Sequence, residues 1–111
     1  MFRFNQEDID RFTDKIVMTP GPLETECWVW TGAKSRGQGN LQWYGSFRIG
    51  RIVVRAHKFA YVAIGRRVWT KGLHLDHHCE NSLCVRPCHL EAVTREVNQE
   101  RKYRREYDYK H

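Results

Sequence analysis

Cysteine and histidine are concentrated in one short segment of this chain, Leu75–Asn98. The segment holds three of the four cysteines and three of the six histidines, and Asp76 stands directly before the first histidine pair. Thiolates and imidazoles are the ligands that zinc prefers, and imidazole also exchanges protons near neutral pH. The segment therefore predicts a metal site and acid–base chemistry side by side.

The pattern Cys-x4-Cys-x4-His, residues 79 to 89, supplies three zinc ligands within one loop. A closed structural zinc site needs a fourth. His78 and Cys88 are local candidates, but each adjoins another ligand, and neighbouring side chains of an extended chain point apart. Cys27 is the better candidate because it would staple a distant strand to the loop, which leaves Cys88 a free thiol. We predict a structural Zn²⁺ bound by Cys27, Cys79, Cys84 and His89.

Positive charge dominates the middle of the sequence. The net charge is +6, and no Asp or Glu occurs from Cys27 to Leu75. A solvated surface usually mixes both signs, so this bias predicts a polyanionic partner, a nucleic acid. The partner that we expect is double-stranded DNA. The basic residues of the stretch are Lys34, Arg36, Arg48, Arg51, Arg55, Lys58, Arg66, Arg67 and Lys71.

A chain of 111 residues is the size of one domain with a modest core, which a metal ion would help to stabilise. We divide it into an N-terminal extension, residues 1–20, and a main domain, residues 21–111. No apolar run approaches the ~18 residues of a membrane span, and the first ten residues are too charged for a signal peptide. We expect a cytoplasmic protein, in which grouped cysteines bind metal before they form disulfides.

The first half of the chain alternates turn and strand signals. Asn5 is placed to cap a helix whose apolar positions are Ile9, Phe12 and Ile16, and Met18–Pro22 breaks it. Residues 27–31 have strand composition, and residues 32–40 form a glycine-rich loop that we expect to be mobile. Strands over residues 41–49 and 51–55 would follow, joined at Gly50 as a hairpin that places Arg48 opposite the core face.

The second half favours a helix over residues 56–64, stopped by Gly65, with His57 in a core or capping role. Strands are expected over residues 68–76 and 90–93. Thr94 would cap a final helix that begins at Arg95 and runs to about Tyr107. The predicted fold class is α+β, a small single domain with antiparallel β-hairpins and a structural zinc site.

These residues together resemble the HNH (His-Me finger) nucleases, and within them the zinc-bearing branch similar to the His–Cys box homing endonucleases. The resemblance covers roughly residues 27–105 and implies a ββα-metal motif, with a strand to His77, a strand at residues 90–93 and a helix carrying Asn98. Its anchors in this sequence are Cys27-Trp-Val-Trp, Tyr44-Gly-Ser-Phe, Ala56-His-Lys, Asp76-His-His-Cys-Glu-Asn, Cys84-Val-Arg-Pro-Cys-His-Leu-Glu and Val93-Thr-Arg-Glu-Val-Asn.

The resemblance implies a separate catalytic role for each of three residues. His77 would be the general base, and Asn98 with Asp76 would bind a catalytic divalent ion, Mg²⁺ or Mn²⁺. The reaction would be hydrolysis of a DNA phosphodiester bond, leaving 5′-phosphate and 3′-hydroxyl ends. An arginine of the basic hairpin would stabilise the transition state, with Arg48, Arg51 and Arg55 as candidates.

Three residues depart from the family pattern. His89 stands where many relatives have an Asn that orients the base, so a backbone carbonyl is expected to orient His77. Arg86 stands where Asn usually precedes the proline and would add a phosphate contact. His78 directly follows the expected base, and because strand residues alternate, only one of the two histidines faces the metal.

Several alternatives stay open from the sequence. The chain could be a non-catalytic, zinc-stapled DNA-binding protein, a nicking or homing-type enzyme, or an accessory nuclease of a phage packaging assembly. A homodimer or a phage protein is a further expected partner, with a location in the host cytosol if the chain is phage-encoded. The predicted DNA contacts are Arg48, Arg51, Arg55, Lys58, Arg86, Arg101 and Arg105.

Overall fold

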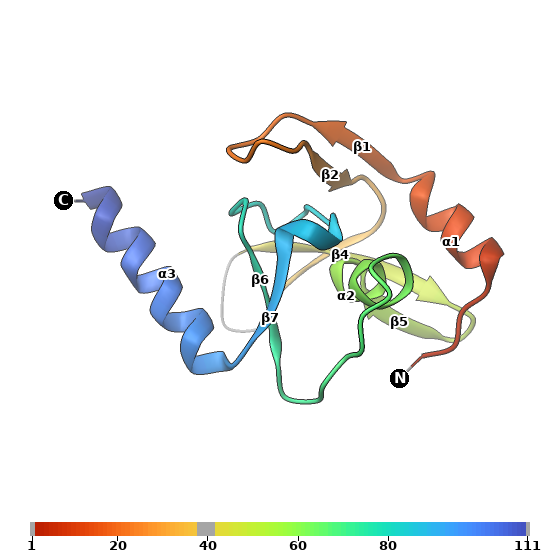
Figure 1. The fold of residues 1–111 in the computed structure, drawn as a ribbon. Coiled ribbons are helices and arrows are strands. Elements are labelled where there is room, and N and C mark those ends of the chain that lie inside the picture. Colours follow the sequence, from red (N-terminus) through yellow and green to blue (C-terminus); the bar gives the residue numbers. More distant parts are fainter. Residues whose placement is uncertain (1, 38–41, 111) are drawn as a thin grey trace.

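The computed structural model describes residues 2–37 and 42–110, with side chains up to residue 104. Within these residues the strands form three antiparallel sheets, and helices flank them (Figure 1). The predicted α+β class is confirmed. The strands are β1 (Ile16–Thr19), β2 (Cys27–Trp30), β3 (Lys34–Arg36), β4 (Trp43–Ile49), β5 (Ile52–Arg55), β6 (His74–His77) and β7 (Leu90–Val93). The helical segments are α1 (Gln6–Thr13), α2 (Ala56–Phe59), η1 (Ala60–Ile64), η2 (Pro87–His89) and α3 (Arg95–Lys110).

Helix α1 begins at the predicted cap. The Asn5 side chain accepts a hydrogen bond from the backbone N–H of Asp8 at 3.0 Å, and the Asp8 carboxylate accepts one from the N–H of Asn5 at 2.9 Å. The helix ends at Thr13, so its predicted continuation to Ile16 and the break at residues 18–22 are wrong. Ile16 instead opens β1, whose pairing with β2 outweighs the local helical pattern.

Aromatic rings form the main core. Phe12 of α1 lies 4.6 Å from Trp30 and 4.8 Å from Phe59 between ring centroids, and Phe47 lies 4.8 Å from Phe59. Such tilted pairs add to the free energy gained by burying the rings. Residues before and after the proposed boundary at residue 20 share this core, while the boundary itself remains a prediction.

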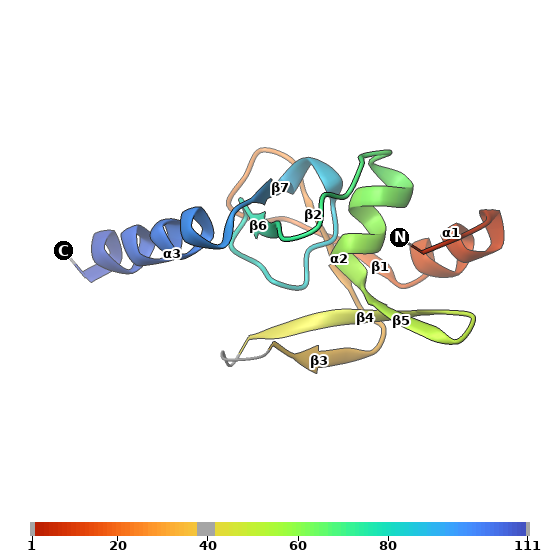
Figure 2. The same ribbon diagram turned by 90° about the horizontal axis from the view of Figure 1, so that it is seen from below.

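The sheet β3–β4–β5 lies beneath α2, as Figure 2 shows. Gly50 takes a positive φ of 58° at the predicted hairpin turn, and Arg48 is exposed while Phe47 and Ile49 are buried. Strand β3 occupies part of the expected glycine-rich loop, so that prediction is wrong for residues 34–36, which gain hydrogen-bonded partners on β4. Residues 38–41 lie outside the described residues. They include the end of the predicted loop and the predicted first residue of the next strand.

The third sheet joins α3 to form a ββα unit. Strand β6 pairs with β7 in the register His77↔Leu90 and Asp76↔Glu91. The strand predicted from residue 68 begins only at His74, after a turn at Gly72 with φ of 91°. Thr94 accepts a hydrogen bond from the N–H of Val97 at 3.2 Å and caps α3, as predicted. In both ribbon views α3 extends away from the rest of the molecule.

Among the described residues, no helix has the combination of length and apolar character needed to cross a bilayer.

Candidate active site and zinc site

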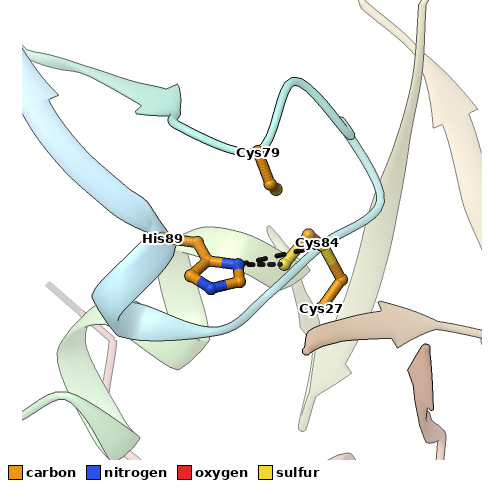
Figure 3. A group of neighbouring side chains, drawn as sticks. All are labelled: Cys27, Cys79, Cys84 and His89. Carbon is orange, nitrogen blue, oxygen red and sulfur yellow. Dashed lines mark hydrogen bonds between the residues drawn. The ribbon is translucent and has the colours of Figure 1, made fainter. Parts of the chain in front are cut away.

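The four predicted zinc ligands meet in one buried cluster (Figure 3). Cys27 comes from the start of β2, His89 from η2 and the other two cysteines from the loop between β6 and η2. The ligand atoms all lie within 4.8 Å of one another. The Nδ1 atom of His89 lies 3.5 Å from the Sγ of Cys84 and 3.8 Å from the Sγ of Cys27. Ligands about 2.0–2.3 Å from one tetrahedral zinc ion have separations of this size, so the cluster fits zinc.

The surroundings of the cluster also suit a metal. Thr25 Oγ1 lies 2.6 Å from Nε2 of His89, which leaves Nδ1 facing the sulfurs. A hydrogen bond from Cys84 lowers the pKa of the Cys79 thiol, while burial raises the pKa of Cys27. The site therefore favours a thiolate at Cys79, which is the metal-binding form of cysteine.

The two rejected local candidates lie elsewhere. Cys88 is exposed, and its sulfur accepts a hydrogen bond from the Nε of Arg86 at 3.2 Å. His78 lies 2.8 Å from the carboxylate of Glu91 through its Nε2 atom. Neither belongs to the cluster around His89.

A tight turn separates the zinc cluster from the second candidate site. Strand β6 ends at His77, and the N–H of Glu80 donates to the carbonyl of His77 at 3.0 Å. Glu80 takes a positive φ of 60°. The chain therefore turns directly after His77, and this turn directs the side chains of His77 and Cys79 to different sites.

The second site is a pocket of about 210 Å³ between β6, β4 and α3. It contains all three residues predicted to act in catalysis, Asp76, His77 and Asn98. Nε2 of His77 and Oδ1 of Asn98 are buried, and neither has a hydrogen-bond partner among the described residues. Buried polar atoms are rarely left unpaired, so an unpaired acceptor and an unpaired amide oxygen in one pocket mark a binding site.

Burial favours the neutral form of the His77 ring. Burial lowers its pKa to about 4, although the charges of Cys79 and Asp76 and a backbone hydrogen bond with Cys84 raise it. The orientation of His77 by a backbone carbonyl remains a prediction. When Nδ1 carries the proton toward that acceptor, Nε2 presents its lone pair to the pocket.

Asp76 is almost fully buried, at 2 % exposure, and pairs with α3. Nη1 of Arg101 lies 3.1 Å from Oδ2 of Asp76 and 2.9 Å from Oε1 of Glu91. Arg101, predicted to contact DNA, is thus engaged in ion pairs next to the candidate metal ligand. Its contact with DNA remains a prediction.

Sequence reasoning missed several residues of the pocket. Lys102 and Tyr44 line it, and the Tyr44 ring lies 6.4 Å from that of His77. His57 does not line the pocket, but its ring stacks on that of His77 with centroids 5.1 Å apart, which agrees with the core or capping role favoured from the sequence. The helical spacing of Asn98 and Lys102, four residues apart on one face, could have indicated Lys102. No local pattern links Tyr44 or His57 to His77.

The predicted DNA-binding residues are distributed unequally around this pocket. Arg55 stacks over Tyr44 at 5.2 Å, which places it beside the site, whereas Arg48 and Arg51 lie at the turn end of the β4–β5 hairpin. Lys58 lies over the Trp69 ring at 4.7 Å. Arg86 donates to the carbonyl of Glu26 at 2.9 Å, next to the candidate zinc ligand Cys27. The Arg105 side chain lies outside the described residues.

Residues 54–100 match the family model described as HNH endonuclease. The resemblance to HNH endonucleases is confirmed. This matched segment spans less than half of the chain. It contains Asp76, His77 and Asn98 and every candidate zinc ligand except Cys27. The Cys₃His cluster is consistent with the zinc-bearing branch of the HNH enzymes. Comparisons with curated proteins and with solved structures give no match.

Proposed function

We propose that this protein is a metal-dependent DNA endonuclease in which His77 is the general base. The observation that carries the proposal is a pair of buried atoms in one pocket, Nε2 of His77 and Oδ1 of Asn98, which have no hydrogen-bond partner among the described residues. Both residues lie in the segment that matches the HNH family model. Hydrolysis of a phosphodiester requires a base that can take a proton from water next to a metal-binding site. Nε2 of His77 would be that base, and the oxygen of Asn98 would help to bind the metal.

The donor set fits a hard divalent cation. The Asn98 amide oxygen and the Asp76 carboxylate are oxygen ligands, which Mg²⁺ and Mn²⁺ prefer. A bound ion would also give a partner to Oδ1 of Asn98, which has no hydrogen-bond partner among the described residues. When bound, the ion would neutralise charge on the scissile phosphate and at the leaving 3′-oxygen. The pocket and the Cys₃His cluster are chemically distinct, so we assign the hard ion to the pocket and a structural Zn²⁺ to the cluster.

The chain's own groups account for the proton transfer. Nε2 of His77 takes a proton from water, and the backbone contact at Cys84 holds the ring while it becomes charged. The depressed pKa of His77 keeps the ring neutral and available at pH 7. The attacking oxygen joins phosphorus, the bond between phosphorus and the 3′-oxygen breaks, and the 3′-oxygen takes a proton from solvent. This gives 5′-phosphate and 3′-hydroxyl ends.

Basic residues near the pocket would hold the DNA backbone. Lys102 lines the pocket, and Arg55 reaches its edge over Tyr44. We assign transition-state stabilisation to Arg55 rather than to Arg48 or Arg51, because those two lie at the far end of the hairpin. The remaining predicted contacts would bind phosphates along the duplex.

A supercoiled-plasmid assay tests the proposal against a protein that only binds DNA. We expect nicking with Mg²⁺ or Mn²⁺, none with a chelator present, and ligatable ends carrying 5′-phosphate. DNA binding without any cleavage by zinc-loaded protein, across both metals, would contradict the proposal and favour the non-catalytic alternative. Cleavage that appears only after another protein is added would favour the accessory nuclease.

A further inference from the structure

Two carboxylates face one another across the β6–β7 hairpin. Asp76 and Glu91 are direct partners in the strand register, and Asp76 is buried while Glu91 is half exposed. Like charges directly opposite on neighbouring strands repel. The pair therefore requires a cation, and α3 provides one.

Arg101 bridges both carboxylates through its guanidinium. Nη1 lies 3.1 Å from Oδ2 of Asp76 and 2.9 Å from Oε1 of Glu91, and Nη2 lies 3.5 Å from Oε2 of Glu91. The planar fork of arginine suits such a multiple contact, whereas a lysine ammonium is a single point charge. The hydrogen bond from Arg101 lowers the pKa of Glu91, and the same bond raises the pKa of Arg101.

The chain of contacts extends one residue further. Nε2 of His78 lies 2.8 Å from Oε1 of Glu91, the same oxygen that Arg101 contacts. His78 directly follows the proposed base, yet it contacts Glu91 and does not line the pocket. The order of contact is therefore Asp76, Arg101, Glu91 and His78.

Arg101 also fixes the helix that carries Asn98. The two residues are three positions apart on α3 and therefore share a face. Arg101 thus ties to β6 the same helical face that directs Asn98 into the pocket. The relative positions of the two proposed oxygen ligands, one on a strand and one on a helix, depend on this contact.

We infer that Arg101 is a positioning residue for the catalytic metal site, orienting the Asp76 carboxylate and holding α3 so that Asp76 and Asn98 face one ion. This inference rests on the proposed function, since it concerns the same pocket. Groups that hold a metal-ligating carboxylate are worth about 10- to 100-fold in metal affinity or activity. Glu91 and His78 hold Arg101 in turn.

Direct measurement of Mn²⁺ binding tests the role without depending on turnover. The His77→Ala protein, loaded with zinc and bound to a DNA duplex, is titrated with Mn²⁺ while the free ion is followed by electron paramagnetic resonance. We expect Arg101→Gln in this background to weaken Mn²⁺ binding about 10- to 100-fold. Arg104→Gln is the matched control, because Arg104 lies on the same helix but pairs with Glu100 at 2.9 Å on the exposed side. It should leave Mn²⁺ binding unchanged.

Arg101→Lys keeps the test informative if the glutamine variant does not fold. Lysine retains the charge but cannot bridge two carboxylates in the same way, so a weaker loss of Mn²⁺ affinity is expected. Unchanged or tighter Mn²⁺ binding in folded, zinc-loaded Arg101 variants would overturn the inference; tighter binding would show that Arg101 competes with the ion. Loss of Mn²⁺ binding in a protein that never cleaves DNA would support the positioning role while refuting the proposed function.

Discussion

The ring of His57 stacks on the ring of His77, with centroids 5.1 Å apart and an interplanar angle of 28°. Tyr44 stacks on His57 in turn, at 5.7 Å, so three rings support one wall of the pocket. Nδ1 of His57 is buried and has no hydrogen-bond partner among the described residues. The face of His57, rather than its nitrogen atoms, therefore makes the contact with the proposed base.

Replacing His57 separates ring stacking from acid–base chemistry. His57→Phe keeps an aromatic face against His77 and should retain most of the cleavage rate. His57→Ala removes the face, so we expect slower cleavage and a free energy of unfolding lower by about 1–3 kcal/mol. Denaturant unfolding and initial nicking rates measure both. Equal loss of cleavage in the two variants would instead assign His57 a chemical role.

The same histidine predicts how stability depends on pH. Burial lowers the pKa of His57 well below its ordinary value, so the folded state binds fewer protons than the unfolded state. The contribution of neutral His57 to the free energy of unfolding is fully present above the unfolded pKa of about 6.5. This contribution is lost as the pH falls below that value. His57→Phe should therefore lose less stability than the wild type between pH 7.5 and pH 5. Zinc release affects both proteins, and an identical loss in both would contradict the prediction.

The zinc cluster was the part of the site most accessible to sequence reasoning. Ligand spacing alone selected three members, and the exclusion of sequence neighbours selected Cys27, which lies close to Cys84 because β2 contacts the zinc loop through the Val29–Cys84 bridge. Local signals were equally reliable for the Asn5 cap and the Gly50 turn, where one residue type satisfies one backbone requirement.

Features set by tertiary contact escaped the same reasoning. Strand β3 is three residues long and exposed, and only its pairing with β4 defines it. Ile16 continues a helical pattern but pairs with Trp30 instead. Arg101 and Asp76 are 25 residues apart, so their ion pair follows from how α3 docks on β6 and from no motif.

Removal of a zinc ligand should destabilise the whole fold. Cys79→Ser should lose stoichiometric zinc, and loss of a few kcal/mol would lower Tm by about 10 °C or more in a domain of this size. Cys88→Ser is the matched control, because Cys88 is exposed and outside the cluster. Metal analysis and thermal unfolding check both variants. Retained zinc with unchanged Tm in Cys79→Ser would refute the zinc assignment.

The two hairpin arginines should respond differently to substitution. Arg55→Ala removes the hairpin arginine nearest the pocket, so we expect cleavage to fall about 100-fold at saturating protein. Arg51→Ala should mainly weaken DNA binding and reduce its salt dependence, because a phosphate contact far from the pocket affects affinity. Single-turnover cleavage at saturation separates rate from binding. The assignment fails if Arg51→Ala lowers the saturated rate as much as Arg55→Ala does.

The most direct test of the account is plasmid nicking by His77→Ala. His74→Ala is the matched control, since His74 is an exposed histidine at the other end of β6. We predict that His77→Ala loses metal-dependent nicking while zinc content and DNA binding stay at wild-type levels, and that His74→Ala cleaves normally. Nicking by zinc-loaded His77→Ala at the wild-type rate would show that another group activates the water and would contradict the account.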